Sequence, residues 1–104
     1  MRIWDIPASK LCRKHLLGEH VEMHMFAGCL KKGLSLQGYL SNQLVEIHNI
    51  KRRHDILAKE MKRRGYNHNS ELAPNININA GFVDSNANLA ELRSRCPDCR
   101  ASFY

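Results

Sequence analysis

The sequence predicts an all-α, compact single domain of two long helices plus a short C-terminal helix and an irregular arm. Two observations predict the long helices: apolar residues recur at helical spacing over two stretches, and a glycine follows each stretch where a helix would end. The third observation is the length of 104 residues, which allows one modest hydrophobic core. Residues 1–104 are therefore expected to form one domain.

The first long helix is predicted to run from Ser9 to about Lys32. Ser9 follows Pro7 and suits an N-cap, while Gly33 can end the helix. Glu22 falls on a face that adjoins the apolar stripe, where a carboxylate is partly shielded yet reachable. The stripe itself is formed by Cys12, Leu16, Met23, Ala27, Leu30 and Leu34.

An extended, strand-like segment precedes this helix. Met1 to Ser9 spans at most about 30 Å, and Glu22 lies roughly 18–20 Å along the helix from Ser9. The segment can therefore fold back along the helix. We expect the terminal nitrogen of Met1 and the carboxylate of Glu22 to come together.

The second long helix is predicted to start at Ser41 or Asn42 and to run to Arg64, with Gly65 as its stop. Its buried stripe is expected to be Leu44, Ile47, Ile50, His54, Leu57 and Met61. Its exposed remainder carries Lys51, Arg52, Arg53, Lys59, Lys62, Arg63 and Arg64 against only Asp55 and Glu60. This face is the expected phosphate-contacting surface; the alternative is a solvated helix face with a basic end.

The C-terminal third is less regular. Residues 67–88 are rich in asparagine, contain Pro74 and Gly81, and show no helical period, which predicts a loop or arm. Asp84 or Ser85 can cap a short last helix through Leu89 and Leu92. Residues 89–104 are thus expected to form a short helix and a Cys-x-x-Cys tail.

The formal net charge of +6 and a pI near 9.4 favour a polyanionic partner such as nucleic acid. No apolar run approaches the roughly 18 residues that cross a bilayer, and the start of the chain lacks a signal-peptide core. We therefore expect a cytoplasmic, soluble protein without a membrane partner. Four cysteines without a secretory signal indicate reduced thiols or a metal site.

Cys96 and Cys99 have the two-residue spacing that lets both thiolates bind one zinc ion, but such a pair is half a site. Cys12 and Cys29 are predicted on one helix about 25 Å apart, so they cannot both complete it. His68 or a partner chain would have to contribute. Free or redox-active thiols are the alternative.

The first residue offers a nucleophile. Arg2 is bulky enough to block removal of the initiator methionine, so the mature chain is expected to begin with the free amine of Met1. An α-amine titrates near 7.7–8.0 and a lysine near 10.4, so roughly a tenth of free α-amines are neutral at pH 7. Only the neutral amine attacks carbon. This end is therefore suited to Schiff-base chemistry.

Met1-Arg2-Ile3-Trp4 and the run from His15 to Glu22 closely resemble the pyrimidine-dimer DNA glycosylase family of small phage and microbial repair enzymes. The likeness covers residues 1–34 and 38–39, then Lys51-Arg52-Arg53-His54 and residues 60–68. It implies that the Met1 amine forms an imine with deoxyribose C1′ of damaged double-stranded DNA and that Glu22 assists. The competing carboxylate is Glu19.

The same resemblance implies glycosylase and AP lyase activity on pyrimidine dimers or abasic sites, with strand cleavage by β-elimination. Imine chemistry needs no cofactor, so none is expected. We also expect the protein to be a monomer. A base inside a duplex must be exposed before reaction, and damaged bases are easier to unstack.

Candidate DNA contacts lie near both reactive groups. Arg2 is expected at the phosphate beside the lesion, because a guanidinium fork matches phosphate oxygens. His15 lies two helical turns before Glu22 and is expected to orient a phosphate or the carboxylate; the alternative is a satisfied, partly buried histidine. Arg13 and Lys14 are further candidates.

Two other functions stay open. Val21 stands where the family usually carries an arginine before its glutamate, which permits a non-catalytic, basic helical DNA-binding domain. The other alternative is a small zinc-dependent nucleic-acid-binding module built around Cys96 and Cys99.

Overall fold

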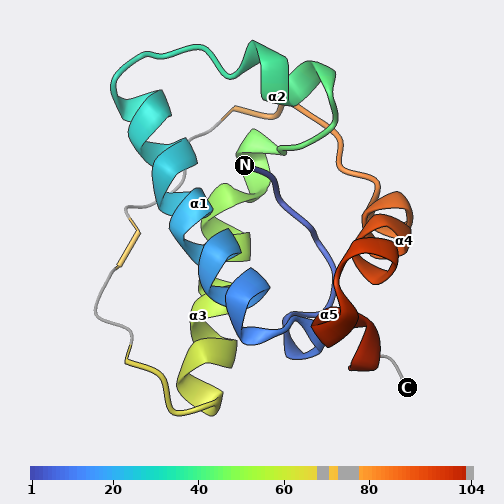
Figure 1. Cartoon of the computed structure of the whole chain (residues 1–104). Coiled ribbons are helices and arrows are strands. Elements are labelled where there is room, and N and C mark those ends of the chain that lie inside the picture. The colour runs from blue at the N-terminus through green and yellow to red at the C-terminus, as the bar shows by residue number, and fades with distance from the viewer. Residues whose placement is uncertain (68–70, 73–77, 103–104) are drawn as a thin grey trace.

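Two antiparallel helices form the centre of the molecule, and two shorter helices close one side (Figure 1). The computed structural model describes residues 1–67, 71–72 and 78–102, and none of these forms a β-strand. The all-α prediction is therefore confirmed. The elements are η1 (Ala8–Lys10), α1 (Arg13–Lys31), α2 (Gln37–Ser41), η2 (Ile47–Asn49), α3 (Ile50–Arg63), α4 (Ser85–Arg95) and α5 (Pro97–Ala101).

Helix α1 starts later than the sequence predicts. Ser9 lies in the 3-10 turn η1, and Cys12 takes the N-cap position. The reason is Leu11, whose extended backbone turns its side chain into the core, where it is 2% exposed. The predicted end is right: Gly33 has a φ of 73°, and the N–H of Leu34 donates to the carbonyl of Cys29.

The second long helix is also shorter than predicted. Ser41 ends α2 instead of capping a helix, and α3 begins only at Ile50. The intervening residues leave the helical path because Val45 is fully buried and the carbonyl of Leu44 accepts a hydrogen bond from the N-terminal segment. Gly65 follows the helix with a φ of 84°, as predicted.

The C-terminal region contains two helices where one was predicted. The carboxylate of Asp84 accepts a hydrogen bond from the N–H of Ala87, so Asp84 is the N-cap of α4, as expected. Residues 85–88 are therefore helical and do not belong to the predicted arm. Part of that arm, with Pro74, lies outside the described residues.

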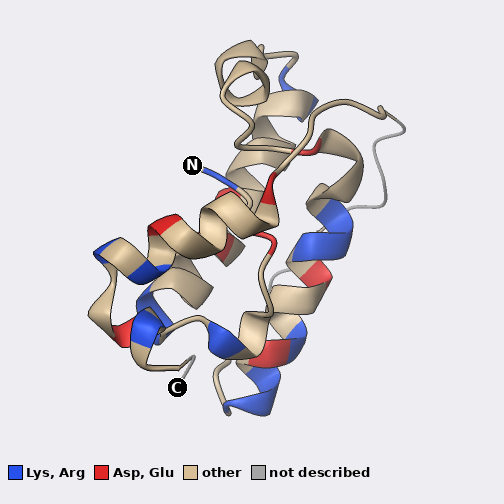
Figure 2. Cartoon of the chain, turned by 90° about the vertical axis from the view of Figure 1, so that its right-hand side faces the viewer, with Lys and Arg blue, Asp and Glu red and all other residues tan. Residues whose placement is uncertain are grey.

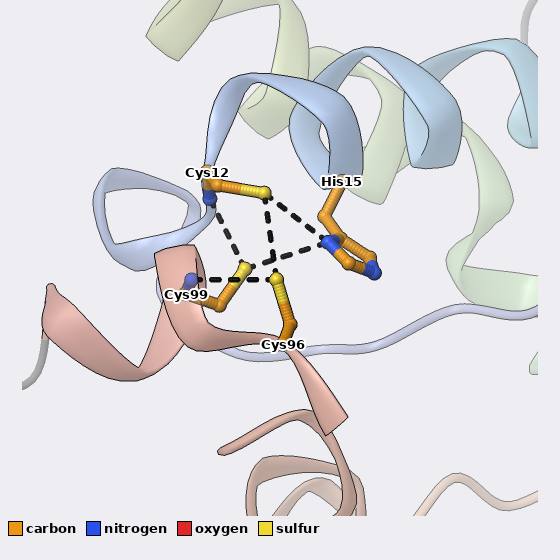
Figure 3. Close-up of side chains that lie close together, drawn as sticks. All are labelled: Cys12, His15, Cys96 and Cys99. Carbon is orange, nitrogen blue, oxygen red and sulfur yellow. Dashed lines mark hydrogen bonds between the residues drawn. The ribbon is translucent and has the colours of Figure 1, made fainter. Parts of the chain in front are cut away.

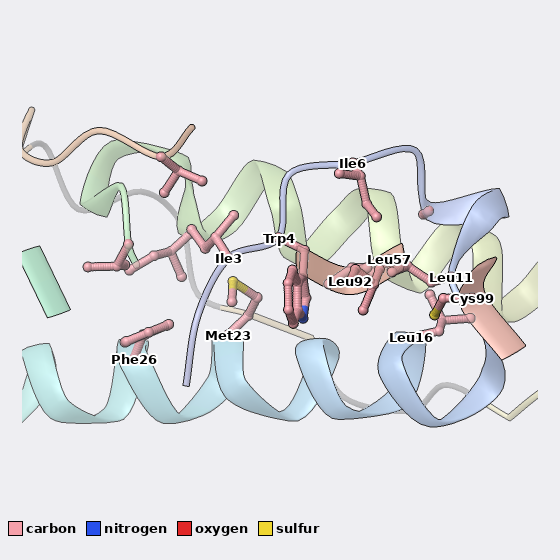
Figure 4. Packing of buried hydrophobic residues seen from close by; sticks show 14 of the residues in the cluster. Ile3, Trp4, Ile6, Leu11, Leu16, Met23, Phe26, Leu57, Leu92 and Cys99 are labelled. Atoms are coloured by element: carbon pink, nitrogen blue, oxygen red, sulfur yellow. The ribbon is translucent and has the colours of Figure 1, made fainter. Parts of the chain in front are cut away.

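The N-terminal segment fills the space between the long helices and α4 (Figure 1). Ile3 is fully buried and Trp4 is 4% exposed, and Figure 4 shows both beside Met23 of α1. Most of the predicted stripe residues face this core, but Leu34 is 55% exposed because the chain has already left α1 there. None of the described helices combines the length and the apolar character needed to span a bilayer.

Candidate active site

The first four residues are anchored by backbone and side-chain hydrogen bonds. The N–H of Ile3 donates to the carbonyl of Leu44 at 2.7 Å. The side-chain amide of Asn88 on α4 donates to the carbonyls of Ile3 and Trp4 at 3.2 and 3.0 Å. The extended segment is thus held from both sides, which fixes the position of the terminal residue.

The expected meeting of Met1 and Glu22 is found. The N–H of Arg2 donates to Oε1 of Glu22 at 2.8 Å, and the terminal nitrogen of Met1 lies 3.9 Å from the same oxygen. Both side chains are partly shielded, 14% exposed for Met1 and 27% for Glu22. The amine and the carboxylate therefore share one half-open environment.

Both groups line one open cavity of about 460 Å³. Gly18 forms part of its wall, and a Cβ built there would lie 3.9 Å from Oε2 of Glu22. A side chain at this position would narrow the approach to the carboxylate. The full lining is Met1, Arg2, Trp4, Lys14, His15, Gly18, Glu19, Glu22, Leu44 and Arg95.

Glu19, the competing carboxylate, is fully buried, and both of its oxygens accept hydrogen bonds. Its two oxygens accept hydrogen bonds from Nε and a terminal nitrogen of Arg53 at 2.6 and 2.9 Å, and Oε2 also accepts from the N–H of Trp4 at 3.1 Å. Burial raises the pKa of the Glu19 carboxyl, while Arg53 acts in the opposite direction. The arrangement suits a structural anchor beneath the cavity and leaves Glu22 as the reachable acid.

Arg2 lies beside the cavity, as expected, but its guanidinium already has partners. It donates to Glu91 at 2.6 Å and to Asn88 at 3.3 Å, and it stacks over the Trp4 ring at 4.4 Å. Arg95 lies over the same ring at 4.7 Å. A phosphate contact by Arg2 would therefore have to replace the ion pair with Glu91.

His15 lines the same cavity as Glu22, but its Nδ1 faces the thiols of Cys12 and Cys99. Its Nδ1 lies 3.2 Å from the sulfur of Cys12 and 3.5 Å from that of Cys99 (Figure 3). Burial, followed by the charge of Arg95, lowers the pKa of the imidazole and favours its neutral form. His15 thus belongs both to the lining of the cavity and to the thiol cluster.

Cys96 and Cys99 do have partners within the chain, contrary to the expectation of an incomplete site. Cys12 and His15 lie against them, whereas Cys29 takes no part in this cluster. His68, the ligand suggested from the sequence, lies outside the described residues. The missed signal is the spacing Cys12-x-x-His15, which repeats the two-residue spacing of the C-terminal pair.

Some of the basic residues predicted on the exposed face of α3 are exposed, and others are buried or half-buried in ion pairs. Figure 2 shows Lys and Arg along this helix and around the C-terminal helices. Lys51, Arg52 and Lys62 retain exposed surface, and Lys51 pairs with Asp55 at 3.0 Å. Arg53, however, is buried, and its guanidinium donates two hydrogen bonds to the carboxylate of Glu19 on α1.

Arg63 and Arg64 both bind Glu60, at 2.6 and 2.7 Å. Arg63 is still 65% exposed. Arg64 also donates to the carbonyl of Leu11 at 2.7 Å, so it joins the end of α3 to the segment before α1, and its side chain is only 17% exposed. Glu60 is correspondingly 7% exposed and does not lie on the solvated face either.

Arg13 and Lys14 lie on the exposed face of the first turn of α1. The guanidinium of Arg13 stacks over the Tyr66 ring at 5.0 Å, while Lys14 borders the cavity. Val21, next to Glu22, is 54% exposed. Lys14 therefore borders the cavity, whereas Val21 is exposed on α1 and is not among the residues that line it.

A protein-family model described as pyrimidine dimer DNA glycosylase matches residues 1–74. The matched part contains the N-terminal segment, α1, α2 and α3, and it ends before α4 and α5. The comparisons with curated proteins and with solved structures give no match.

Proposed function

The chain belongs to the pyrimidine dimer DNA glycosylase family, and we propose that it is a DNA repair glycosylase with AP lyase activity whose nucleophile is the α-amine of Met1. The observation that carries this proposal is the 3.9 Å separation between the Met1 nitrogen and Glu22 Oε1, at the wall of an open cavity. A sugar carbon placed there would be within reach of both groups.

In the first step, the neutral amine of Met1 attacks C1′ as the bond from C1′ to the base breaks. The base leaves with the electron pair and takes up a proton, and the amine loses one. Opening of the bond between C1′ and O4′ then gives the protonated imine. The carboxylate of Glu22 would stabilise the positive charge on the sugar and carry protons during these steps.

In the second step, a base removes a proton from C2′ of the imine. Electrons move to break the bond from C3′ to its oxygen, and the 3′ phosphate leaves with the strand. Water then hydrolyses the imine and restores the amine. Glu22 is the partly shielded carboxylate nearest to the nitrogen that would hold the imine, which suits it to this proton transfer.

We propose double-stranded damaged DNA inside the cell as the substrate, with pyrimidine dimers or abasic sites as the lesion and a monomer as the active form. Lys14 and Arg95 place two cationic side chains at the cavity, which suits phosphates that flank an exposed nucleotide. Exposed basic residues of α3, namely Lys51, Arg52, Lys62 and Arg63, and Arg13 on α1 supply additional phosphate contacts.

Borohydride trapping tests this proposal, because it reduces an imine to a stable covalent bond. Purified protein with an intact N-terminus, verified by mass spectrometry, would be incubated with ultraviolet-irradiated and abasic duplexes. We expect an adduct on the N-terminal peptide, lost when the α-amine is acetylated. Glu22→Gln should lower turnover at least about tenfold, whereas Glu71→Gln, at an exposed site outside the cavity, should not.

Two outcomes would contradict the proposal. An adduct mapped to a lysine would remove Met1 as nucleophile. DNA binding without any adduct on either duplex would instead support the non-catalytic DNA-binding domain that Val21 permits.

A further inference from the structure

Three cysteines and one histidine from distant parts of the chain meet in one cluster (Figure 3). Cys12 is the N-cap of α1, and His15 is the third residue of that helix. Cys96 is the N-cap of α5, and Cys99 is the third residue of that helix. The two pairs therefore occupy equivalent positions, and their side chains point toward one another.

The four ligand atoms all lie within 4.8 Å of one another, and three of their separations are close to the edges of a tetrahedral zinc site. With bonds of about 2.3 Å to sulfur and 2.0–2.1 Å to nitrogen, a tetrahedron has edges of about 3.8 Å between sulfurs and about 3.6 Å between sulfur and nitrogen. The sulfurs of Cys12 and Cys96 lie 3.9 Å apart. The sulfurs of Cys12 and Cys99 lie 3.2 and 3.5 Å from Nδ1 of His15.

The surroundings of the sulfurs also suit a metal more than a disulfide. A disulfide needs a bond of about 2.05 Å, and the four cysteines are free thiols. The N–H of Cys12 donates to the sulfur of Cys99 at 3.2 Å, and the N–H of Cys99 donates to the sulfur of Cys96 at 3.4 Å. Such bonds stabilise negative charge on sulfur.

We propose that Cys12, His15, Cys96 and Cys99 bind one zinc ion in a closed, four-coordinate site. Three thiolates and one imidazole are a soft ligand set that selects zinc over magnesium or calcium. Four protein ligands leave no open position for water or substrate, so the role of the ion is structural.

This site goes beyond the proposed function because it joins two different parts of the chain. Cys12 and His15 lie within the residues that match the family, whereas Cys96 and Cys99 follow them. Zinc would thus hold α4 and α5 against the start of α1. Since Asn88 and Arg95 of α4 contact the first four residues, the ion would also support one wall of the cavity.

The test starts with the metal content of the full chain, purified under reducing conditions and measured by elemental analysis. We expect one zinc per chain. Cobalt(II) added to the metal-free protein should give the visible bands of tetrahedral cobalt and a thiolate charge-transfer band. Both readouts are made without DNA, so they stand or fall independently of glycosylase activity.

Variants locate the ion. Cys99→Ser should reduce zinc to well below one per chain, while Cys29→Ser, outside the cluster, should leave the content unchanged. His15→Cys should keep the metal with four thiolates, which guards against a variant that loses zinc merely through misfolding. Chelation should lower the Tm of the wild type and of Cys29→Ser, and added zinc should restore it.

The proposal fails if the reduced wild-type chain binds neither zinc nor cobalt. It also fails if cobalt binds without a thiolate band, because this would place the metal on the second cluster, His20, His24 and His54, whose ring nitrogens also lie within 4.8 Å of one another. Loss of metal in His24→Asn with normal content in Cys99→Ser would likewise overturn it.

Discussion

Replacement of Arg53 by methionine should cost about 3–5 kcal/mol of unfolding free energy, because it leaves the buried Glu19 carboxylate without its cation. The side chains of Arg53 and Glu19 are 2% and 0% exposed, and two hydrogen bonds of 2.6 and 2.9 Å join them. Of these contacts, only the Trp4 N–H would remain in Arg53→Met. Against a typical total stability of about 5–15 kcal/mol, this loss is large.

Urea unfolding followed by circular dichroism measures the loss directly. Lys51→Met is the matched control, because it breaks an exposed pair with Asp55 on the same helix and should cost at most about 0.5 kcal/mol. A double variant, Glu19→Gln with Arg53→Met, removes both charges and should recover part of the loss. The reasoning is refuted if Arg53→Met is no more destabilising than Lys51→Met.

The loss in Arg53→Met should also depend on pH. Burial raises the pKa of Glu19, and removal of the arginine takes away the main influence that opposes this rise. When folding raises the pKa of an acid, the protein is most stable below the unfolded-state pKa, where the acid is protonated. This stability is lost as the pH rises through the folded-state pKa. Arg53→Met should therefore be closer to wild type near pH 4.5 than at pH 8.

Three further predictions concern the helices. Gly28→Ala and Gly18→Ala should each stabilise α1 by up to about 1 kcal/mol. Only Gly18→Ala should slow imine trapping, because its Cβ would lie 3.9 Å from Oε2 of Glu22 at the cavity wall, whereas a Cβ at Gly28 would meet no side chain within 4 Å. Arg63 and Arg64 bind Glu60 and lower the pKa of its carboxyl to about 2. Their pairing with Glu60 therefore contributes to the free energy of unfolding above pH 4.5, and this contribution is lost as the pH falls toward 2. Glu60→Gln should thus lower the free energy of unfolding by about 1 kcal/mol at pH 7, since solvent screens the exposed Arg63. The variant should also lose less stability than the wild type between pH 4.5 and pH 2. An unchanged dependence of stability on pH in this range would contradict the prediction. Lys62→Ala should weaken DNA binding and reduce the slope of log K against log salt by about 0.9, measured by fluorescence anisotropy at several salt concentrations; an unchanged slope would remove Lys62 from the DNA surface.

Local signals accounted for the helix ends and for part of the site. Gly33, Gly65 and Asp84 act through their own backbone or side chain, so their positions can be read from the sequence. The juxtaposition of Met1 and Glu22 was also predictable, because a short extended segment can reach only the nearby part of the following helix. The role proposed for the pair came from the family resemblance.

The predicted starts of the two long helices were wrong, because core packing overrides local propensity there. Ser41 and Ser9 both suit an N-cap, but burial of Leu11 and Val45 moved the true helix starts to Arg13 and Ile50. Side-chain pairing likewise decided which cations remain exposed. A helical face alone cannot show that Arg53 is buried against another helix.

The sequence by itself determined the all-α class, the family and the nearness of amine to carboxylate, because these depend on short-range periodicity and on motifs within one stretch of chain. The tertiary structure alone decided that Cys12 and His15 meet Cys96 and Cys99, and that Asn88 and Arg95 support the N-terminal segment. These contacts join residues more than 80 positions apart. Their formation depends on how α4 and α5 pack, which neither spacing nor helical period specifies.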